Sequence, residues 1–375
     1  MVALRFRLLL VAAALLAFGG ALWAPFQFDD FSLLNDAALD ASGGWRQVFR
    51  LEQTRPLTYL SFWLNVQAGS APWAFHLVNL LLHLGCVWLV VDVLAELLPL
   101  RAAMLGAALF AIHPLQTEAV VYVFARATLL ATLFSLAGWR AWVRGRLWAA
   151  VPWFAAALLA KEEAAAFPLM LALLEWGTSR RKQALGPLAA MLGLALAAGL
   201  RAVYAVGAVA GSGAGAQAGI TPFDYFSVQG VAILRYLWLL MAPVGLTVDA
   251  EVRVAPLAAS VAWGVLAVVA MLAWKSVRAA QAGFWILGGL ILLLPSSSVF
   301  PAADLAADRR MYLPMVCFCG LAGLLLGRAD WRLLTGYVAV LGALSVAQTQ
   351  VWQSPQGLWM EASRQAPEKV RPKRQ

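Results

Sequence analysis

The chain alternates between long apolar runs and short polar segments. The runs lack the strict alternation of apolar and polar residues that marks a half-buried strand. Because a backbone in lipid satisfies its hydrogen bonds only in helices or closed barrels, the runs predict transmembrane helices. We therefore expect an all-α polytopic membrane protein with about eleven spans. The predicted spans are 8–24, 73–98, 102–113, 117–139, 147–160, 164–177, 185–207, 256–274, 281–295, 311–327 and 332–348.

Short basic clusters between the runs orient these helices. Lys and Arg near the ends of spans mark cytoplasmic loops, which here predicts an N-terminus inside and a C-terminus outside. Segment 226–242 would reverse the later helices if it crossed, so we expect it to be re-entrant or interfacial on the outer side. The basic residues expected inside are Arg5, Arg7, Arg101, Arg140, Arg144, Arg146, Arg180, Arg181, Lys182, Lys275, Arg278, Arg328 and Arg332.

We expect one membrane domain over residues 1–350 and a short outer-face tail over 351–375. The first apolar run lacks a clear cleavage site, so we interpret it as an uncleaved helix. The first outer loop, 25–72, contains apolar stretches such as 57–66 that are too short to span a bilayer. These stretches predict helices lying at the membrane interface.

Composition agrees with this pattern. The chain is 62% hydrophobic and 13% charged, with a mean hydropathy of +0.77, whereas soluble domains have roughly 45–50% apolar and about 25% charged residues. The net charge of +9 comes from scattered loop clusters, which argues against a nucleic-acid partner. The cysteines Cys86, Cys317 and Cys319 lie within apolar runs and predict inert buried thiols.

Ionisable residues gather on the predicted outer side. The segment Phe28-Asp-Asp-Phe31 directly follows the first apolar run. Ionisable groups at membrane depth are costly and are functional candidates for that reason. Together the patches offer carboxylates for proton transfer and cations for a departing phosphate. The patches are Asp29 and Asp30, Arg55 to Asn65, His113 to Glu118 with Arg126, Lys161 to Glu163, and Asp308 to Pro314.

Structural interpretations of the same residues remain open. The two aspartates also suit a helix cap, and Arg55 also suits a lipid-facing position. Glu118 and Arg126 also suit a buried ion pair, Lys161 an interfacial position, and Arg309 with Arg310 a lipid-headgroup contact. The remaining polar residues share one face of the second helix, which favours interhelical hydrogen bonds over a metal site. They are His76, Asn79 and His83.

In this order the patches resemble the integral-membrane glycosyltransferases of the GT-C superfamily. They are most similar to the transmembrane and tetratricopeptide-repeat O-mannosyltransferases and their bacterial relatives. The resemblance covers nearly the whole membrane region. The matching text is Phe28-Asp-Asp-Phe31, Arg55-Pro-Leu-Thr-Tyr-Leu-Ser-Phe-Trp-Leu-Asn65, Phe75-His-Leu-Val-Asn-Leu-Leu-Leu-His83, His113-Pro-Leu-Gln-Thr-Glu-Ala-Val120, Lys161-Glu162 and Asp308-Arg-Arg-Met-Tyr-Leu-Pro314.

The resemblance implies an inverting glycosyltransferase that uses a polyprenyl-phosphate-linked sugar. It implies transfer to a protein or glycan acceptor on the outer face, here the periplasmic face of a bacterial inner membrane. Asp29 or Asp30 is then the general base, and the pair is also the candidate site for a divalent metal. The residues expected to bind the carrier phosphate or substrate are Arg55, Glu118, Arg126, Lys161, Arg309, Arg310 and Tyr312.

The chain departs from the family pattern at two points. Relatives often carry an acid where Thr128 stands, so a role for that acid is not expected. The lead-in to the repeats is present at Trp352 and 358–367, but the sequence ends at Gln375 without a repeat array. A repeat-bound acceptor is therefore not expected.

Two other functions are alternatives. A flippase or transporter would need polar groups near the bilayer midplane and inverted repeats. The sequence contains no internal repeat of that kind, and its charged candidates gather at one face. A non-catalytic membrane subunit is the third hypothesis.

Overall fold

The computed structural model describes residues 4–34, 36, 39, 45–50, 53–176, 181–208, 220–250, 254–277, 282–298, 300–302 and 304–365. The described residues form α-helices and short 3-10 helices without a β-strand. The elements are α1 (Leu4–Phe18), η1 (Gly19–Trp23), η2 (Phe28–Leu34), η3 (Trp45–Phe49), α2 (Pro56–Ala68), α3 (Pro72–Leu97), α4 (Leu100–Ile112), η4 (Pro114–Gln116), α5 (Thr117–Val121), η5 (Val123–Ala125), α6 (Arg126–Val143), α7 (Ala150–Ala160), η6 (Glu162–Ala166), α8 (Phe167–Glu175), α9 (Arg181–Ala208), α10 (Pro222–Met241), α11 (Pro256–Ser276), α12 (Ala282–Leu293), η8 (Asp308–Met311), α13 (Pro314–Leu326), α14 (Trp331–Trp352) and α15 (Pro355–Gln365). The predicted all-α class is confirmed.

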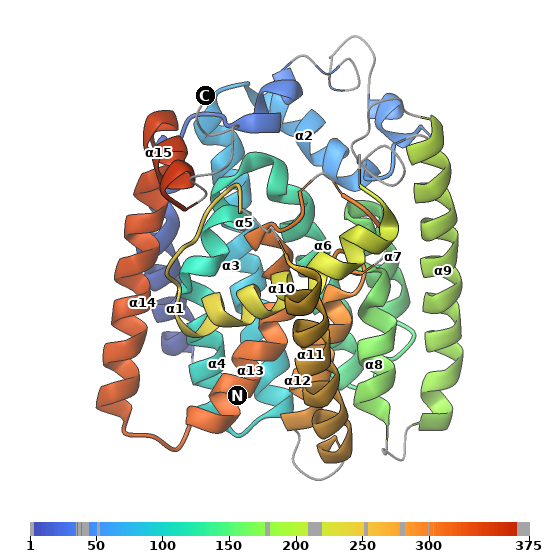
Figure 1. Cartoon of the computed structure of the whole chain (residues 1–375). Helices are drawn as coiled ribbons and strands as arrows, with labels where there is room; N and C mark the ends of the chain where they lie inside the picture. Colours follow the sequence, from blue (N-terminus) through green and yellow to red (C-terminus); the bar gives the residue numbers. More distant parts are fainter. Residues whose placement is uncertain are drawn as a thin grey trace.

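The bundle is built around α3, α4, α6 and α13: α3 packs against α4 and α6, and α4 packs against α13. Helix α9 flanks one side of this core, and α1 and α14 lie on the opposite side (Figure 1). Small residues let the central helices approach closely, as is typical in membranes. A Cβ on Gly106 of α4 would lie 2.7 Å from the carbonyl oxygen of Cys319 in α13. The three cysteines are buried and unpaired by disulfides, as predicted.

The described part of every predicted span overlaps helix, but the span 117–139 is broken at Tyr122 and the helices differ in length. Among the residues that the structure describes, five helices are long and apolar enough to cross a membrane, and the bent pair Leu100–Ile112 and Pro114–Val121 makes a sixth if it forms one span. The shorter apolar helices α7, α12 and α13 have 11 to 13 residues, fewer than the roughly 20 needed to span. The structure thus supports a multi-pass membrane protein, while eleven spans and their orientation stay predictions.

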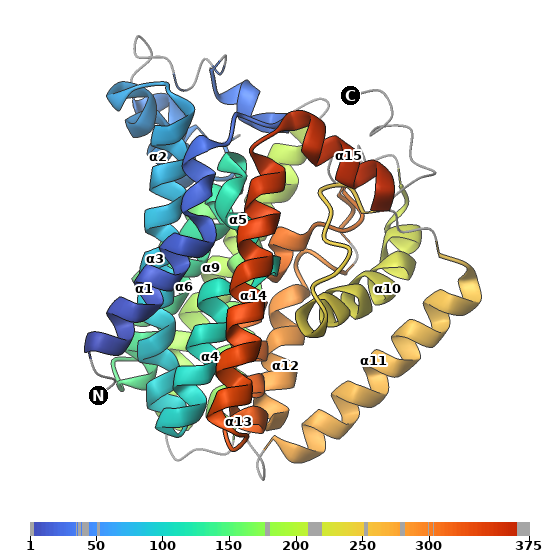
Figure 2. The ribbon, with the colours of Figure 1, turned by 90° about the vertical axis from the view of Figure 1, so that its left-hand side faces the viewer.

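Helix α10 is the expected exception among the long helices. Its 20 residues run obliquely to α14 in both side views (Figures 1 and 2). Arg235 of α10 pairs with the buried Asp308 of η8 at 2.5 Å, which ties α10 to the bundle. The predicted short helix in the first loop is present as α2, near the upper end of the bundle in Figure 1. Interfacial positions for both remain predictions.

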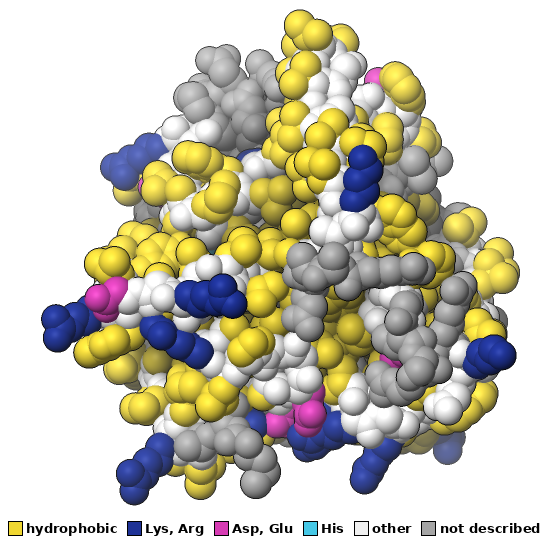
Figure 3. All heavy atoms as spheres, turned by 90° about the horizontal axis from the view of Figure 1, so that it is seen from below, with side chains coloured by type: hydrophobic (Ala, Val, Ile, Leu, Met, Phe, Trp, Pro, Cys, Tyr) yellow, Lys and Arg dark blue, Asp and Glu magenta, His cyan; other side chains and the backbone are white. Residues whose placement is uncertain are grey.

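The lower face of the molecule carries Lys and Arg around its rim and few acidic side chains (Figure 3). The charge rule predicts this distribution for a cytoplasmic face. Arg180 and Arg278, which were expected there, lie outside the described residues. The segment 366–375 of the predicted tail also lies outside them.

Candidate active site

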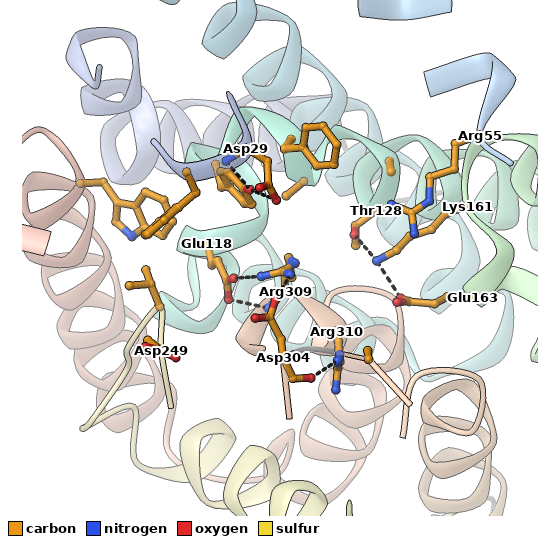
Figure 4. Close-up of a pocket in the computed structure, with 18 of the residues that line it drawn as sticks. Asp29, Arg55, Glu118, Thr128, Lys161, Glu163, Asp249, Asp304, Arg309 and Arg310 are labelled. Carbon is orange, nitrogen blue, oxygen red and sulfur yellow. Dashed lines mark hydrogen bonds and ion pairs between the residues drawn. The ribbon is translucent and has the colours of Figure 1, made fainter. Parts of the chain in front are cut away.

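A cavity of about 430 Å³ brings together polar residues from distant parts of the chain (Figure 4). Its volume falls within the range of about 300–1,000 Å³ that is typical of small-molecule sites. Its lining comes from η2, from α5 to the start of α6, from the segments after α7 and after α10, from η8 and the segment before it, from the end of α14 and from α15. Six of the nine predicted site residues line it: Asp29, Arg55, Glu118, Lys161, Arg309 and Arg310.

Asp29 lines the cavity next to an unusual backbone conformation. The preceding residue, Phe28, has a φ of 48°, a left-handed value that is uncommon for a residue with a side chain. The hydroxyl of Tyr122 donates to Asp29 Oδ2 at 2.9 Å. The Phe28 ring meets the Tyr122 ring edge-on at 5.8 Å between centroids. Together these contacts leave the exposed Asp29 carboxylate beside open space.

Asp30 points away from the cavity and is 1% exposed. Its Oδ1 accepts the N–H of Phe124 at 2.8 Å, and its Oδ2 accepts the N–H of Gln27 at 3.1 Å. Burial raises the pKa of Asp30 to about 7, although these two N–H groups oppose the shift. The structure therefore separates the predicted pair into one carboxylate at the cavity and one that fastens η2 to η5.

This separation bears on the metal hypothesis. A shared metal would need oxygens from both aspartates aimed at one point, but both oxygens of Asp30 already accept backbone N–H groups. The part of the chain that the structure describes holds no group of three or more His, Cys, Asp and Glu side chains able to bind a metal. Only Asp29 of the pair lines the cavity, and a divalent metal held by both aspartates stays a prediction.

The cations on the other side of the cavity are held by defined partners. Arg55 Nε donates to Glu162 Oε2 at 2.9 Å. Lys161 Nζ donates to Thr128 Oγ1 at 2.9 Å and pairs with Glu163 Oε2 at 2.7 Å. Burial lowers the pKa of Lys161 and Glu163 opposes this. Burial would raise the pKa of Glu162, but Arg55 lowers it to about 2, so this ion pair persists at neutral pH.

Helix α2 helps to position this side. Thr58 Oγ1 donates to the carbonyl oxygen of Ala160 at 2.8 Å, the residue directly before Lys161. Arg55 is the residue that precedes the first turn of α2. The same short helix therefore positions Arg55 and fixes the chain beside Lys161.

Arg309 lies in the middle of the cavity (Figure 4). Arg310 lies toward the side that carries Arg55 and Lys161, which we call the cationic side. Arg309 pairs with Glu118 Oε1 at 2.5 Å and with Asp304 Oδ2 at 2.8 Å. Arg310 instead donates to the carbonyl oxygens of Leu305 and Asp304, at 3.3 and 2.6 Å. Carbonyl oxygens orient a guanidinium without cancelling its charge. Arg310 therefore suits an anionic ligand better than Arg309 does.

Two further predicted residues, Arg126 and Tyr312, are buried in the bundle and do not line the cavity. Arg126 is fully buried and donates to Asn79 Oδ1 and the Phe75 carbonyl oxygen, both at 2.9 Å. The hydroxyl of Tyr312 lies 2.7 Å from His83 Nδ1. Neither Arg126 nor Tyr312 lines the cavity. Asn79 and His83 make the interhelical hydrogen bonds that their spacing predicted.

The alternative ion pair between Glu118 and Arg126 is not formed. Glu118 accepts from Arg309 rather than from Arg126. The helix breaks at Tyr122, between Glu118 in α5 and Arg126 in α6. That break redirects Glu118 into the cavity.

Sequence reasoning did not select several lining residues. Tyr122 gave no motif signal, and Thr128 was noted only as a departure. Trp352 and Trp359 were assigned to a tail, yet both line the cavity through α14 and α15. Asp249 and Asp304 complete the acidic lining. Only tertiary packing brings these residues to the site, so spacing along the chain gives no signal for them.

A second hollow of about 720 Å³ adjoins the cavity. The two share Arg55, Glu163, Ala302 and Arg310. Much of the remaining lining is apolar and comes from α9 and the segment after α12. This lining includes Leu196, Leu200, Val203, Pro295, Phe300 and Pro301. We call this hollow the apolar groove, and it meets the cavity at its cationic side.

Comparison with known proteins supports the resemblance. A protein O-mannosyl-transferase from Drosophila melanogaster, Tmtc2, is 41% identical over 145 residues, covering 34% of this chain and 15% of the relative. The human protein O-mannosyl-transferase TMTC4 is 36% identical over 160 residues, covering 35% of this chain and 22% of the relative. The chain is similar to protein O-mannosyl-transferases. It spans less than a quarter of the length of these relatives.

Other comparisons are weaker. No protein-family model matches the chain. An oligosaccharyltransferase from Archaeoglobus fulgidus, solved with a tethered acceptor peptide, is 11% identical, with a TM-score of 0.36 over 84% of this chain and 48% of that one. This likeness is too low to support an argument. The similarity to protein O-mannosyl-transferases therefore rests on sequence.

Proposed function

We propose that this protein is a membrane glycosyltransferase that transfers a sugar from a polyprenyl-phosphate carrier to an acceptor hydroxyl. The observation that carries the proposal is the joining of a charged cavity to an apolar groove at Arg55 and Arg310. A polyprenyl chain is apolar and its phosphate is anionic. The groove suits the chain, and the shared arginines suit the phosphate. The relatives' names support a protein acceptor, and an envelope glycan or lipid is the other candidate.

The transfer is a substitution at the anomeric carbon. The acceptor oxygen forms a bond to that carbon while its proton moves to the Asp29 carboxylate. The bond from the carbon to the phosphate oxygen breaks, and its electron pair leaves with the polyprenyl phosphate. Attack opposite the leaving phosphate inverts the configuration. Arg310, Arg55 and Lys161 stabilise the charge that develops on the phosphate.

The rest of the cavity positions these groups. Glu118 and Asp304 hold Arg309 in place, and Tyr122 orients Asp29. We propose that the cavity opens on the outer face, which in a bacterium is the periplasmic face of the inner membrane. This orientation follows the predicted eleven spans with the N-terminus inside and the C-terminus outside.

The deciding experiment compares Asp29→Asn with Asp30→Asn in purified full-length protein. The substrates are a panel of hexosyl polyprenyl phosphates, beginning with mannose, and hydroxyl-bearing peptides. We expect Asp29→Asn to reduce sugar transfer by on the order of a thousandfold or more, because the base is lost while donor binding remains. Asp30→Asn keeps measurable transfer, since its role is to fasten the loop.

The control is the folded state of each variant, measured by monodispersity and thermal unfolding in detergent. Full activity in both single variants and in the double variant would sink the proposal. Movement of intact donor across vesicles without sugar transfer would favour a flippase instead. Absence of any donor turnover would favour a non-catalytic subunit.

A further inference from the structure

The direction of the Arg310 side chain is set by backbone carbonyl groups. Its Nη2 donates to the carbonyl oxygen of Asp304 at 2.6 Å (Figure 4), and its Nη1 donates to that of Leu305 at 3.3 Å. Both carbonyls belong to the segment that joins α12 to η8. Connecting segments are in general more mobile than the helices they join. The position of the guanidinium in the cavity therefore depends on what holds this segment in place.

Helix α10 supplies groups that hold the segment. Gln229 Nε2 donates to the carbonyl oxygen of Leu305 at 3.0 Å, and this is the oxygen that also accepts from Arg310. Two positions later, the N–H of Ala307 donates to Tyr236 Oη at 2.8 Å. The two side chains therefore bind consecutive peptide groups of the segment, directly before the helix that carries Arg310.

Gln229 and Tyr236 are both fully buried. They stand seven positions apart, which is about two turns of an α-helix, so both lie on one face of α10. Burying an amide costs free energy unless it is hydrogen-bonded. The structure shows a bond for Gln229 Nε2 and, among the described residues, no hydrogen-bond partner for its Oε1. An apolar side chain of similar size would avoid that cost, so packing alone does not account for a glutamine at this position.

An effect of these two residues on the reaction has to pass through the segment. Neither of them lines the cavity or the apolar groove. Because a carbonyl of the segment orients Arg310, a shift of that carbonyl moves the guanidinium as well. Arg309 is held differently, by the carboxylates of Glu118 and Asp304. A disturbance from α10 is therefore expected to act on Arg310 first.

We propose that Gln229 and Tyr236 are positioning residues for Arg310. They fix the peptide groups whose carbonyl directs the guanidinium toward the phosphate oxygen on which charge develops. A misplacement of about 1 Å in a reacting geometry can cost on the order of a hundredfold in rate, so small shifts of this segment matter. This inference rests on the proposed function, because it names residues that act through one of its phosphate-binding groups.

The test measures sugar transfer by full-length protein in detergent, with a hexosyl polyprenyl phosphate and hydroxyl-bearing peptides. We expect Gln229→Leu and Tyr236→Phe each to lower kcat about tenfold, because Arg310 remains present but is less well placed. The KM for donor should change less than twofold, since Arg55 and Lys161 still bind the phosphate. Tyr236→Phe removes a single oxygen atom and serves as the second variant if Gln229→Leu does not fold.

A double-mutant cycle separates positioning from general packing. If Gln229 acts through Arg310, adding Gln229→Leu to Arg310→Gln should lower kcat less than twofold further. If Gln229 only supports packing, the losses from the two changes multiply, and the inference is overturned. The same cycle is run with Tyr236→Phe.

The matched control is Thr349→Val. Thr349 is also buried, and its hydroxyl donates to a backbone carbonyl oxygen, that of Ala17, at 3.1 Å, but it joins α14 to α1. Its kcat should equal that of the wild type. Wild-type kcat in both Gln229→Leu and Tyr236→Phe overturns the inference and leaves the proposed function intact. Lack of donor turnover in every form, the wild type included, refutes the proposed function itself.

Discussion

The molecule contains two clusters of arginines and carboxylates that differ in what surrounds them. In the first, Asp92 of α3 pairs with Arg7 at 2.7 Å, with Arg140 at 2.8 Å and with Arg144 at 3.7 Å. These contacts join α1, α3 and α6 directly. In the second, the charged residues surround a cavity of about 430 Å³. The first cluster fastens helices, whereas the second leaves room for a ligand.

The difference teaches that ion pairs alone do not identify a site. Exposed ion pairs contribute roughly 0–1 kcal/mol to stability, and they occur at both clusters. The cavity differs because it has open space beside its charged side chains. Carbonyl or hydroxyl oxygens orient some of these side chains, as they do for Arg310 and Lys161. Three predictions test this distinction in order of decreasing effect.

The largest effect in this comparison is expected at Arg310. Arg310→Gln should lower kcat for sugar transfer by about 100-fold, because one donor to the developing phosphate charge is removed. Initial rates with saturating donor measure this effect. The matched change in the first cluster is Arg144→Gln, which should alter kcat less than twofold. An equal loss of kcat in Arg310→Gln and Arg144→Gln would show that the two clusters do not differ in function.

A smaller effect is expected at Tyr122, which touches no substrate in the proposed reaction but positions Asp29. Tyr122→Phe removes the hydroxyl that donates to Asp29 Oδ2. We expect kcat to fall about tenfold, since a hydrogen bond to a charged group contributes roughly 1.5–3 kcal/mol. The KM for donor should not change.

The control for Tyr122 is Tyr337→Phe on α14, whose side chain is 37% exposed. Its kcat and its KM for donor should not change. An equal fall in kcat for Tyr337→Phe, or a raised KM for donor in Tyr122→Phe, would contradict a positioning role for the Tyr122 hydroxyl.

Much of the fold was predictable because apolar runs long enough for lipid must be helical. The number of membrane spans was harder to predict. Helix α7, with 11 residues, is apolar like a spanning segment, but only the structure reveals its length and its neighbours. The cationic side of the cavity was also predictable, since Arg55, Lys161 and Arg310 stand in short polar patches at the ends of apolar runs.

The rest of the site depends on three-dimensional packing. Adjacent carboxylates gave the same sequence signal, yet Asp29 lines the cavity while Asp30 is buried. Both residues lie in the 3-10 helix η2, where three residues make a turn and neighbouring side chains point about 120° apart. Which of the two faces the cavity depends on how η2 packs against the bundle. Trp359 lies about 330 positions from Phe28 along the chain, so only the packing of α15 brings their rings together.

The smallest effect is a pH dependence of stability at Asp30. Burial raises the pKa of Asp30 from 3.8 to about 7 in the folded protein. The folded state therefore binds this proton more tightly than the unfolded state does. The contribution of the proton to stability is complete below pH 3.8 and is lost as pH rises through about 7.

We expect the melting temperature of the wild type in detergent to fall between pH 5 and 8 by more than that of Asp30→Asn, because asparagine does not titrate. Parallel slopes for the wild type and Asp30→Asn would show that Asp30 does not titrate in this range, and the contrast between the two neighbouring aspartates would then rest on geometry alone.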